Sequence, residues 1–175
     1  RFKTVLVLGG SLGAASINQA VAGCIDRLKS ESVQIIWQTG KYYYEQYKNS
    51  GNDLIWINSF IEDMSAAYSA CDLCVSRAGA TTIAEITNLG IPAIFIPSPN
   101  VAANHQYYNA KALSDKRAAI LLKDNEAGEN LFDTIINLIF NEDGLNILKS
   151  KVKEFARPEA ASEIAKRAIK LAESL

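Results

Sequence analysis

The chain has 175 residues, of which 49% are hydrophobic, and it carries a formal net charge of -1 at neutral pH. This length and apolar content are sufficient for one domain with a substantial core. The near-neutral charge argues against a general nucleic-acid-binding protein, and no apolar run approaches the roughly 18 residues that a membrane-spanning helix needs.

Short apolar segments alternate with helical patterns along the first two thirds of the chain. The predicted strands are Thr4–Leu8, Val33–Trp37, Leu54–Ile57, Leu73–Ser76, Ala93–Ile96 and Ala118–Leu121. The predicted helices between them are Ala15–Lys29, Tyr42–Lys48, Met64–Ala70, Thr81–Leu89 and Asn104–Ser114. Strands and helices that alternate in this way form βαβ units. We therefore expect an α/β fold with a Rossmann-like, doubly wound parallel sheet.

The last third of the chain is predicted to be helical. Its segments are Gly128–Phe140, Gly144–Phe155 and Glu159–Ala172, with Gly144 in a linking turn and Pro158 at a helix start. We expect a single domain over residues 1–175, with a core at about 4–122 and terminal helices at about 128–172 that either cap the sheet or reach toward a partner domain. The chain starts in the first strand without an initiator Met, which suggests a domain of a longer protein.

Three cysteines are present, and two of them, Cys71 and Cys74, have a C-x-x-C spacing. No second pair of Cys or His residues completes a zinc site, so we expect these cysteines to be structural residues in a reducing, cytoplasmic setting.

A glycine-rich turn, Gly9–Ala14, follows the first predicted strand. Glycine lets the backbone turn sharply and approach a pyrophosphate, and Ser11 adds a hydroxyl donor. Alone, this pattern also fits a tight turn without a ligand. A dinucleotide-binding domain would place an acid at the end of the second strand, but that strand is followed by Gln38-Thr39-Gly40. The missing acid disfavours NAD.

A second candidate site begins where the fourth predicted strand ends. The sequence there is Ser76-Arg77-Ala78-Gly79-Ala80-Thr81-Thr82-Ile83-Ala84-Glu85. Backbone amides of this turn lie at the positive end of a helix dipole and attract an anion. Glu85 can accept hydrogen bonds from two vicinal hydroxyls, which predicts a nucleoside diphosphate site. Arg77 faces either phosphate or solvent, and Thr81 and Thr82 either line the site or cap the helix.

Two further loops carry polar chemistry. Asn104 and Gln106 open a helix after the fifth strand and offer the donors and acceptors that sugar hydroxyls require. His105, the single His, is more typical of packing or capping than of catalysis. The segment Phe60–Met64 precedes the helix before the fourth strand, and its backbone is placed to hold the edge of a flat base.

Five ordered segments together resemble the C-terminal half of the MurG family, the bacterial transferases that move N-acetylglucosamine from UDP to a lipid-linked muramoyl-pentapeptide in a two-domain GT-B fold. They are Gly9-Gly10-Ser11-x-Gly13-Ala14, Phe60-Ile61-x-Asp63-Met64, Ser76-Arg77-x-Gly79-Ala80-x-Thr82-x-x-Glu85, Gly90-x-Pro92 and His105-Gln106-x-x-Asn109-Ala110. The similarity runs from about residue 4 to residue 122 and more loosely through the terminal helices.

The resemblance implies a role for each matched position. Ser11 and its loop would face the diphosphate, and Ile61 would meet uracil through its backbone. Residues 80–84 would line the diphosphate and sugar at the start of the helix. Glu85 would hold the ribose hydroxyls and Gln106 would contact N-acetylglucosamine. The residues implied in substrate binding are Gly10, Ser11, Gly13, Ile61, Arg77, Gly79, Ala80, Thr81, Thr82, Ile83, Ala84, Glu85, His105 and Gln106. No metal or other cofactor is implied, and no catalytic residue lies in this chain.

The resemblance also implies what this chain does not contain. The other half of such enzymes supplies the lipid-acceptor site, the membrane contact and the general base, so we expect this chain to bind UDP-N-acetylglucosamine and to have negligible turnover alone. The parent enzyme would work at the cytoplasmic face of the membrane. Leu12 and Ala103 depart from the family pattern, at positions where Gln and an acid are usual.

Two other functions remain open from the sequence. One is a non-catalytic nucleotide-sugar-binding subunit that needs a partner chain. The other is a different UDP-sugar enzyme on the same architecture, such as a galactosyltransferase or an epimerase.

Overall fold

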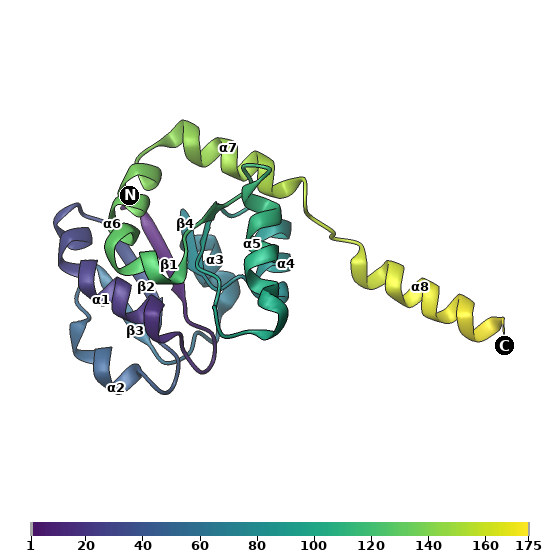
Figure 1. The fold of residues 1–175 in the computed structure, drawn as a ribbon, viewed down its shortest axis with the longest axis horizontal. Coiled ribbons are helices and arrows are strands. Elements are labelled where there is room, and N and C mark those ends of the chain that lie inside the picture. Colours follow the sequence, from purple (N-terminus) through teal and green to yellow (C-terminus); the bar gives the residue numbers. More distant parts are fainter. Residues whose placement is uncertain (1, 175) are drawn as a thin grey trace.

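A six-stranded parallel sheet forms the centre of the computed structural model, which describes residues 2–174 (Figure 1). The strands are β1 (Thr4–Leu8), β2 (Gln34–Gln38), β3 (Ile55–Asn58), β4 (Leu73–Ser76), β5 (Ala93–Phe95) and β6 (Ile120–Leu121). Their order is β3-β2-β1-β4-β5-β6, and every pair is parallel. The order reverses between β1 and β4, and the crevice at the carboxyl ends of such a pair is where open α/β sheets bind ligands.

Eight α-helices surround or extend from this sheet in the described part of the chain. They are α1 (Ala15–Ser30), α2 (Tyr44–Tyr47), α3 (Met64–Ala70), α4 (Ala80–Leu89), α5 (His105–Ser114), α6 (Ala127–Ile139), α7 (Glu142–Lys153) and α8 (Ala160–Glu173). Short 3-10 turns lie at η1 (Lys48–Ser50), η2 (Ala102–Asn104) and η3 (Asp124–Glu126). The doubly wound α/β architecture predicted from the alternating pattern is confirmed.

The turn predicted at Gly144 is wrong. Gly144 lies in the first turn of α7, and its amide donates to the Oδ1 atom of Asn141 at 2.9 Å. Asn141 is the N-cap of α7, so the helix begins before the glycine rather than after it. Pro158 precedes the last helix, which begins at Ala160.

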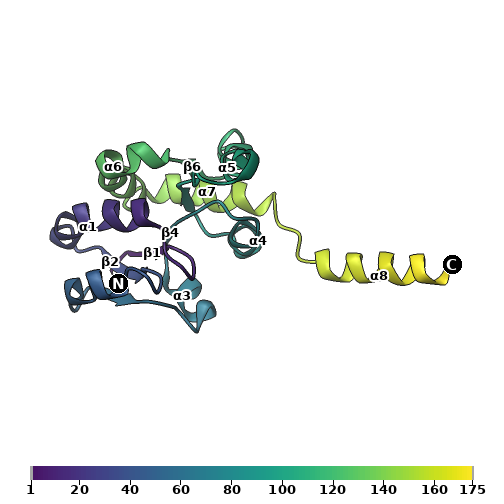
Figure 2. The ribbon, with the colours of Figure 1, turned by 60° about the horizontal axis from the view of Figure 1, so that its bottom comes forward.

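The two faces of the sheet carry separate halves of the core. Val5 and Val7 of β1 point to a cluster with α1 and α6, whereas Leu6 and Leu8 point to a cluster with α3, α4 and α5. This alternation follows from the two-residue period of a strand. Figure 2 shows α1 and α3 on opposite sides of β1 and β2.

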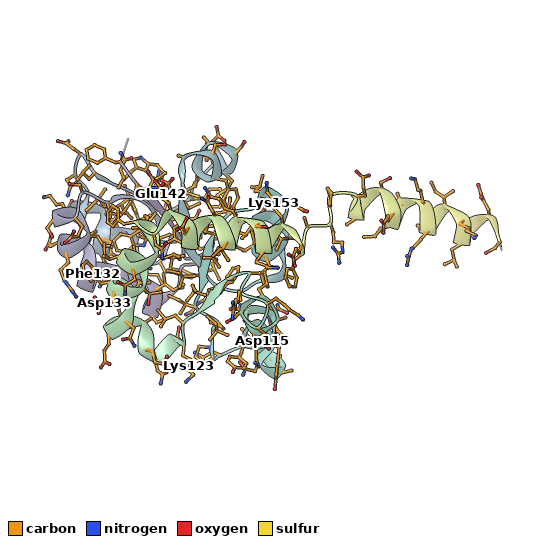
Figure 3. All side chains as sticks on the ribbon, turned by 90° about the horizontal axis from the view of Figure 1, so that it is seen from above. Asp115, Lys123, Phe132, Asp133, Glu142 and Lys153 are labelled. Carbon is orange, nitrogen blue, oxygen red and sulfur yellow. The ribbon has the colours of Figure 1, made fainter. Side chains whose placement is uncertain are left out.

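The last three helices differ in how they pack against the rest of the domain. The buried side chains Leu131, Ile135 and Ile139 hold α6 in the core. On the surface, Phe132 and Asp133 of α6 (Figure 3) contact the guanidinium of Arg27 in α1. The side chain of Lys153, at the end of α7, lies close to Gly90 after α4. By contrast, α8 buries no residue and extends away from the body (Figures 1 and 2). No helix in residues 2–174 is long and apolar enough to cross a membrane.

Candidate functional site

A cavity of about 210 Å³ lies at the carboxyl ends of β1, β2 and β4. It is lined by Leu8, Gly9, Gly10, Gln38, Phe60, Ile61, Met64, Tyr68, Ser76, Arg77, Gly79, Thr82 and Glu85. These residues come from the ends of β1, β2 and β4, from the glycine-rich turn, from the loop before α3, from α3 itself, and from the turn before α4 and its first residues. The fold thus brings three of the predicted segments, far apart in sequence, to one crevice.

The glycine-rich turn is held against the end of β2. The amide of Gly9 donates to the carbonyl of Gln38 at 3.1 Å, and the amide of Lys41 donates to the carbonyl of Ser11 at 3.2 Å. Gly10 has φ +76 and open space around its Cα, so its backbone is accessible. Gly13 has φ +95 and packs against the carbonyl of Thr39, which leaves no room for a side chain.

A buried asparagine of α1 holds the end of β2, against which the glycine-rich turn packs. Asn18 is 0% exposed in α1, and its amide nitrogen donates to the carbonyl of Thr39 at 2.8 Å. Its Oδ1 atom accepts from the indole nitrogen of Trp37 at 2.9 Å. Both polar ends of the side chain are satisfied, so α1 is anchored to the end of β2. The sequence prediction missed this residue because it lies inside a helix.

The start of α4 offers unpaired backbone donors. Its N-cap, Gly79, makes no side-chain cap hydrogen bond, and its first turn contains no acid. The amides of Ala80, Thr81 and Thr82 occupy the first helical positions, where no intrahelical acceptor is available. The positive end of the helix dipole adds to them, which makes this end of α4 suited to an anion.

Glu85 is positioned by a tyrosine from another helix. The hydroxyl of Tyr68 in α3 donates to the Oε2 atom of Glu85 at 2.8 Å. Tyr68 is 8% exposed, and burial raises the pKa of its phenol, so that the hydroxyl stays protonated and remains a donor at neutral pH. This contact occupies one carboxylate oxygen and leaves Oε1 for a ligand.

Removal of the tyrosine hydroxyl tests this arrangement. We expect Tyr68→Phe to keep the fold and to raise the Kd for UDP about fivefold, or about 1 kcal/mol, because Glu85 loses the partner that orients its carboxylate and only part of that hydrogen bond's energy appears in binding. Isothermal titration calorimetry measures this change. Tyr44→Phe, at a half-buried tyrosine of α2, is the matched control. An unchanged Kd in Tyr68→Phe would show that the phenol does not orient the carboxylate.

Arg77 is engaged in a structural cluster. Its guanidinium forms an ion pair with Asp124, donates to the carbonyl of Ile96 at 2.9 Å and donates to the hydroxyl of Ser16 at 2.9 Å. These contacts join the loops that follow β4, β5 and β6 to the start of α1. They favour a role in which Arg77 positions the loops, because the guanidinium already has three partners.

The loop before α3 is also tied to β2. The amide of Ile61 donates to the Oε1 atom of Gln38 at 3.1 Å, and both side chains are buried. Asp63 caps α3 by accepting from the amide of Ala66 at 2.8 Å. The sequence pattern assigned Gln38 no role beyond the absence of an acid, yet this residue lies in the cavity wall.

The loop after β5 lies outside the cavity lining. The Oε1 atom of Gln106 accepts from the amide of Ser98 at 2.9 Å, and the Nδ1 atom of His105 lies 3.0 Å from the carbonyl of Ala102. Both side chains therefore hold their own loop in this structure. Ala103 has φ +51 and the following residue has φ +49, two left-handed residues in succession before α5.

The predicted site residues divide into two groups. Gly10, Ile61, Arg77, Gly79, Thr82 and Glu85 line the cavity. Ser11, Gly13, Ala80, Thr81, Ile83, Ala84, His105 and Gln106 do not. Of the second group, the side chains of Ala80, Ile83 and Ala84 line a separate groove of about 400 Å³ on the side of α4 that faces α5. Any contact that they make in the cavity would have to involve their backbone.

A larger hollow lies beside the cavity, on the other side of the loop before α3. It has a volume of about 660 Å³ and is lined by apolar residues such as Ile36 and Trp56 together with polar residues such as Asn58, Glu62 and Asp63. It contains neither the glycine-rich turn nor the start of α4. We therefore assign the site to the smaller cavity, where the glycine-rich turn, the start of α4 and Glu85 meet.

Comparison with known proteins shows which family this chain belongs to. Residues 4–167 match the model of the glycosyltransferase family 28 C-terminal domain. A UDP-N-acetylglucosamine--N-acetylmuramyl-(pentapeptide) pyrophosphoryl-undecaprenol N-acetylglucosamine transferase from Flavobacterium psychrophilum is 46% identical over 98% of this chain and 47% of its own length. The chain spans about half the length of the curated relatives that it matches.

Solved structures show the same relationship. Acinetobacter baumannii MurG matches with a TM-score of 0.86 and 32% identity, over 97% of this chain and 52% of that one. The glycosyltransferase SnogD from Streptomyces nogalater matches with a TM-score of 0.69 at 17% identity, over 98% of this chain and 44% of that one, which is a likeness of fold alone. The chain therefore belongs to the glycosyltransferase family 28 C-terminal domain family, within its MurG group, and its fold is one half of a GT-B glycosyltransferase.

Proposed function

We propose that this chain is the donor-binding half of a transferase that moves N-acetylglucosamine from UDP-N-acetylglucosamine to a lipid-linked muramoyl-pentapeptide in peptidoglycan synthesis. The observation that carries the proposal is the meeting of three features in one cavity: the glycine-rich turn, the uncapped start of α4 and the Glu85 carboxylate oriented by Tyr68. The name of the Flavobacterium psychrophilum relative supports this choice of donor and acceptor.

The cavity suits the parts of a uridine diphosphate in a definite order. The diphosphate lies between the glycine-rich turn and the first amides of α4, where backbone donors and the helix dipole favour negative charge. The ribose hydroxyls donate to the free oxygen of Glu85. The uracil lies toward Phe60 and Ile61, whose loop closes the end of the cavity near β2.

The chemistry of transfer follows from this placement. As the acceptor hydroxyl attacks the anomeric carbon with inversion, negative charge develops on the departing UDP. Fixed amides and the dipole of α4 stabilise that charge without a metal ion. The acceptor site and the general base belong to the other half of the parent enzyme, at the cytoplasmic face of the membrane.

The last helix supports the idea of a second half. In α8, Ile164, Ile169 and Leu171 are all more than half exposed. An amphipathic helix with an unburied apolar side needs a partner surface. We propose that α8 packs against the other half of the parent enzyme.

Calorimetric titration of the chain tests the proposal. We expect UDP and UDP-N-acetylglucosamine to bind, UDP-galactose to bind more weakly and NAD to give no heat of binding. EDTA should leave the affinity unchanged. Transfer of labelled N-acetylglucosamine to a lipid acceptor should be negligible with this chain alone. Absence of UDP binding by folded protein would overturn the proposal, and robust transfer would overturn the assignment as half of an enzyme.

A further inference from the structure

We propose that Asn109 of α5 is a positioning residue for the diphosphate: it holds the carbonyl of Ala78 and thereby orients the amide N–H of Gly79 toward the cavity. The inference rests on the proposed function, because the diphosphate is that of the nucleotide in the same cavity. Asn109 itself does not line the cavity, so it acts only through the peptide group between Ala78 and Gly79.

The carbonyl of Ala78 depends on this side chain for its hydrogen bond. Nδ2 of Asn109 donates to it at 3.2 Å, and no other donor reaches this oxygen within residues 2–174. Ala78 is 0% exposed, so water does not take the place of the side chain. Because a buried carbonyl without a donor is costly, the carboxamide of Asn109 fixes the direction in which this carbonyl points.

The direction of that carbonyl determines the direction of the next amide. The peptide bond between Ala78 and Gly79 is trans, and the C=O and N–H bonds of a planar trans peptide point in opposite directions. The N–H group of Gly79 therefore points away from Asn109. In the described part of the chain it donates to no acceptor, and a Cβ atom added to Gly79 would meet only the Oγ1 atom of Thr82, at 4.0 Å.

The cavity lies on the side of α4 that is opposite to Asn109. Asn109 and Ala80 line the groove of about 400 Å³ between α4 and α5, whereas Gly79, Thr82 and Glu85 line the cavity. At 3.6 residues per turn, Ala80 projects from the other face of the helix than Thr82 and Glu85. An N–H group that points away from the groove therefore faces the cavity, where it lies directly ahead of the first amides of α4.

The neighbouring peptide groups of this turn are held from within the segment. The carbonyl of Arg77 accepts from the hydroxyl of Ser76 at 3.1 Å, and the carbonyl of Gly79 accepts from the amide of Ile83 at 3.0 Å. The peptide between Ala78 and Gly79 is instead held by a side chain of another helix. Without that side chain the glycine allows the peptide to rotate, and its carbonyl would turn toward the cavity, where a diphosphate needs a donor.

The ratio of the Kd for uridine to the Kd for UDP isolates the diphosphate contacts. The two ligands share the base and the ribose, so the contributions of those parts, including that of Glu85, cancel. NMR spectra of the ¹⁵N-labelled chain report on Gly79 directly. We expect its amide proton to shift downfield when UDP is added to the wild-type chain, because the N–H group then donates to a charged oxygen, and not when uridine is added.

Asn109→Leu is the decisive variant. Leucine is of similar size but has no donor, so the uridine-to-UDP ratio should fall about three- to tenfold, the usual effect of one hydrogen bond, while the Kd for uridine stays the same. Asn109→Ala removes the same donor and serves if Asn109→Leu does not fold. The matched control is Asn88→Leu, the same exchange in the wall of the same groove, where the Oδ1 atom accepts from the amide of Arg157 at 2.8 Å.

The outcomes separate this inference from the proposed function. It is supported if the ratio falls and the downfield shift of Gly79 is lost in a folded Asn109 variant, and neither changes in Asn88→Leu. It is overturned, while the uridine diphosphate site stands, by an unchanged ratio, by equal weakening of UDP and uridine, or by a Gly79 shift that persists in the variants or is missing in the wild-type chain. No binding of UDP by the wild-type chain overturns the proposed function and this inference together.

Discussion

Replacement of Glu85 by alanine is expected to weaken UDP binding by about 1–3 kcal/mol, or roughly 5- to 150-fold in Kd. The carboxylate is held by the hydroxyl of Tyr68 at 2.8 Å and keeps one oxygen free at the cavity. Because the proposed site has this oxygen accept from the ribose hydroxyls, removal of the carboxylate leaves the hydroxyls without a charged partner. Isothermal titration calorimetry with UDP measures the loss.

Comparison of two ligands on the same protein separates the loss of this contact from any loss of folded protein. The wild-type chain should bind 2'-deoxy-UDP more weakly than UDP, and Glu85→Ala should remove most of that difference. Glu129→Ala, at an exposed acid in the first turn of α6, is the matched control and should leave both affinities unchanged. If Glu85→Ala binds both ligands as the wild-type chain does while its circular dichroism spectrum stays native, Glu85 is not the ribose contact.

Replacement of Gly40 by alanine is expected to destabilise the fold by about 3–5 kcal/mol. Gly40 has φ +79, a conformation that an L-residue adopts only with strain, and a Cβ atom there would overlap the amide nitrogen and Cα of Gly13. Two backbone segments meet at this point, so neither can move aside cheaply. Thermal unfolding should show a midpoint lower by about 10 °C or more.

A glycine in open space provides the control. Gly23 lies on the exposed side of α1, where an added Cβ atom would meet no neighbour, so Gly23→Ala should stabilise the protein by about 0.5–1 kcal/mol. The two substitutions add the same methyl group and should act in opposite directions. A Gly40→Ala protein as stable as the wild type would mean that the glycine-rich turn is not pressed against the end of β2.

Most of the architecture was predictable from local patterns. Strands buried on both faces read as short apolar runs, and all six form within one or two residues of the predicted positions. The error at Gly144 arose because glycine usually marks a turn, whereas the cap by Asn141 starts α7 ahead of it. The separation of α8 from the body also had no local signal, since its amphipathic pattern resembles that of a packed helix.

The site was predictable only in part. The glycine-rich turn and the start of α4 could be recognised because each is one continuous segment whose backbone conformation depends on its own residues. Tyr68 and Gln38 were missed because their partners, Glu85 and Ile61, lie 17 and 23 residues away. Arg77 was visible, but its engagement with Asp124 was not, since the two residues are 47 apart.

The amino-acid sequence alone determined that this chain forms a parallel α/β domain, because apolar periodicity acts over a few neighbouring residues, and its ordered motifs carried the resemblance to the MurG group. It also predicted an anion site after the first and fourth strands, from turns whose backbone conformation depends on their own residues. Only the tertiary structure decided that Tyr68 orients Glu85, that Gln38 holds the loop before α3 through the amide of Ile61 and that the guanidinium of Arg77 joins loops. Those choices depend on hydrogen bonds between elements whose distance is set by the packing of the whole sheet.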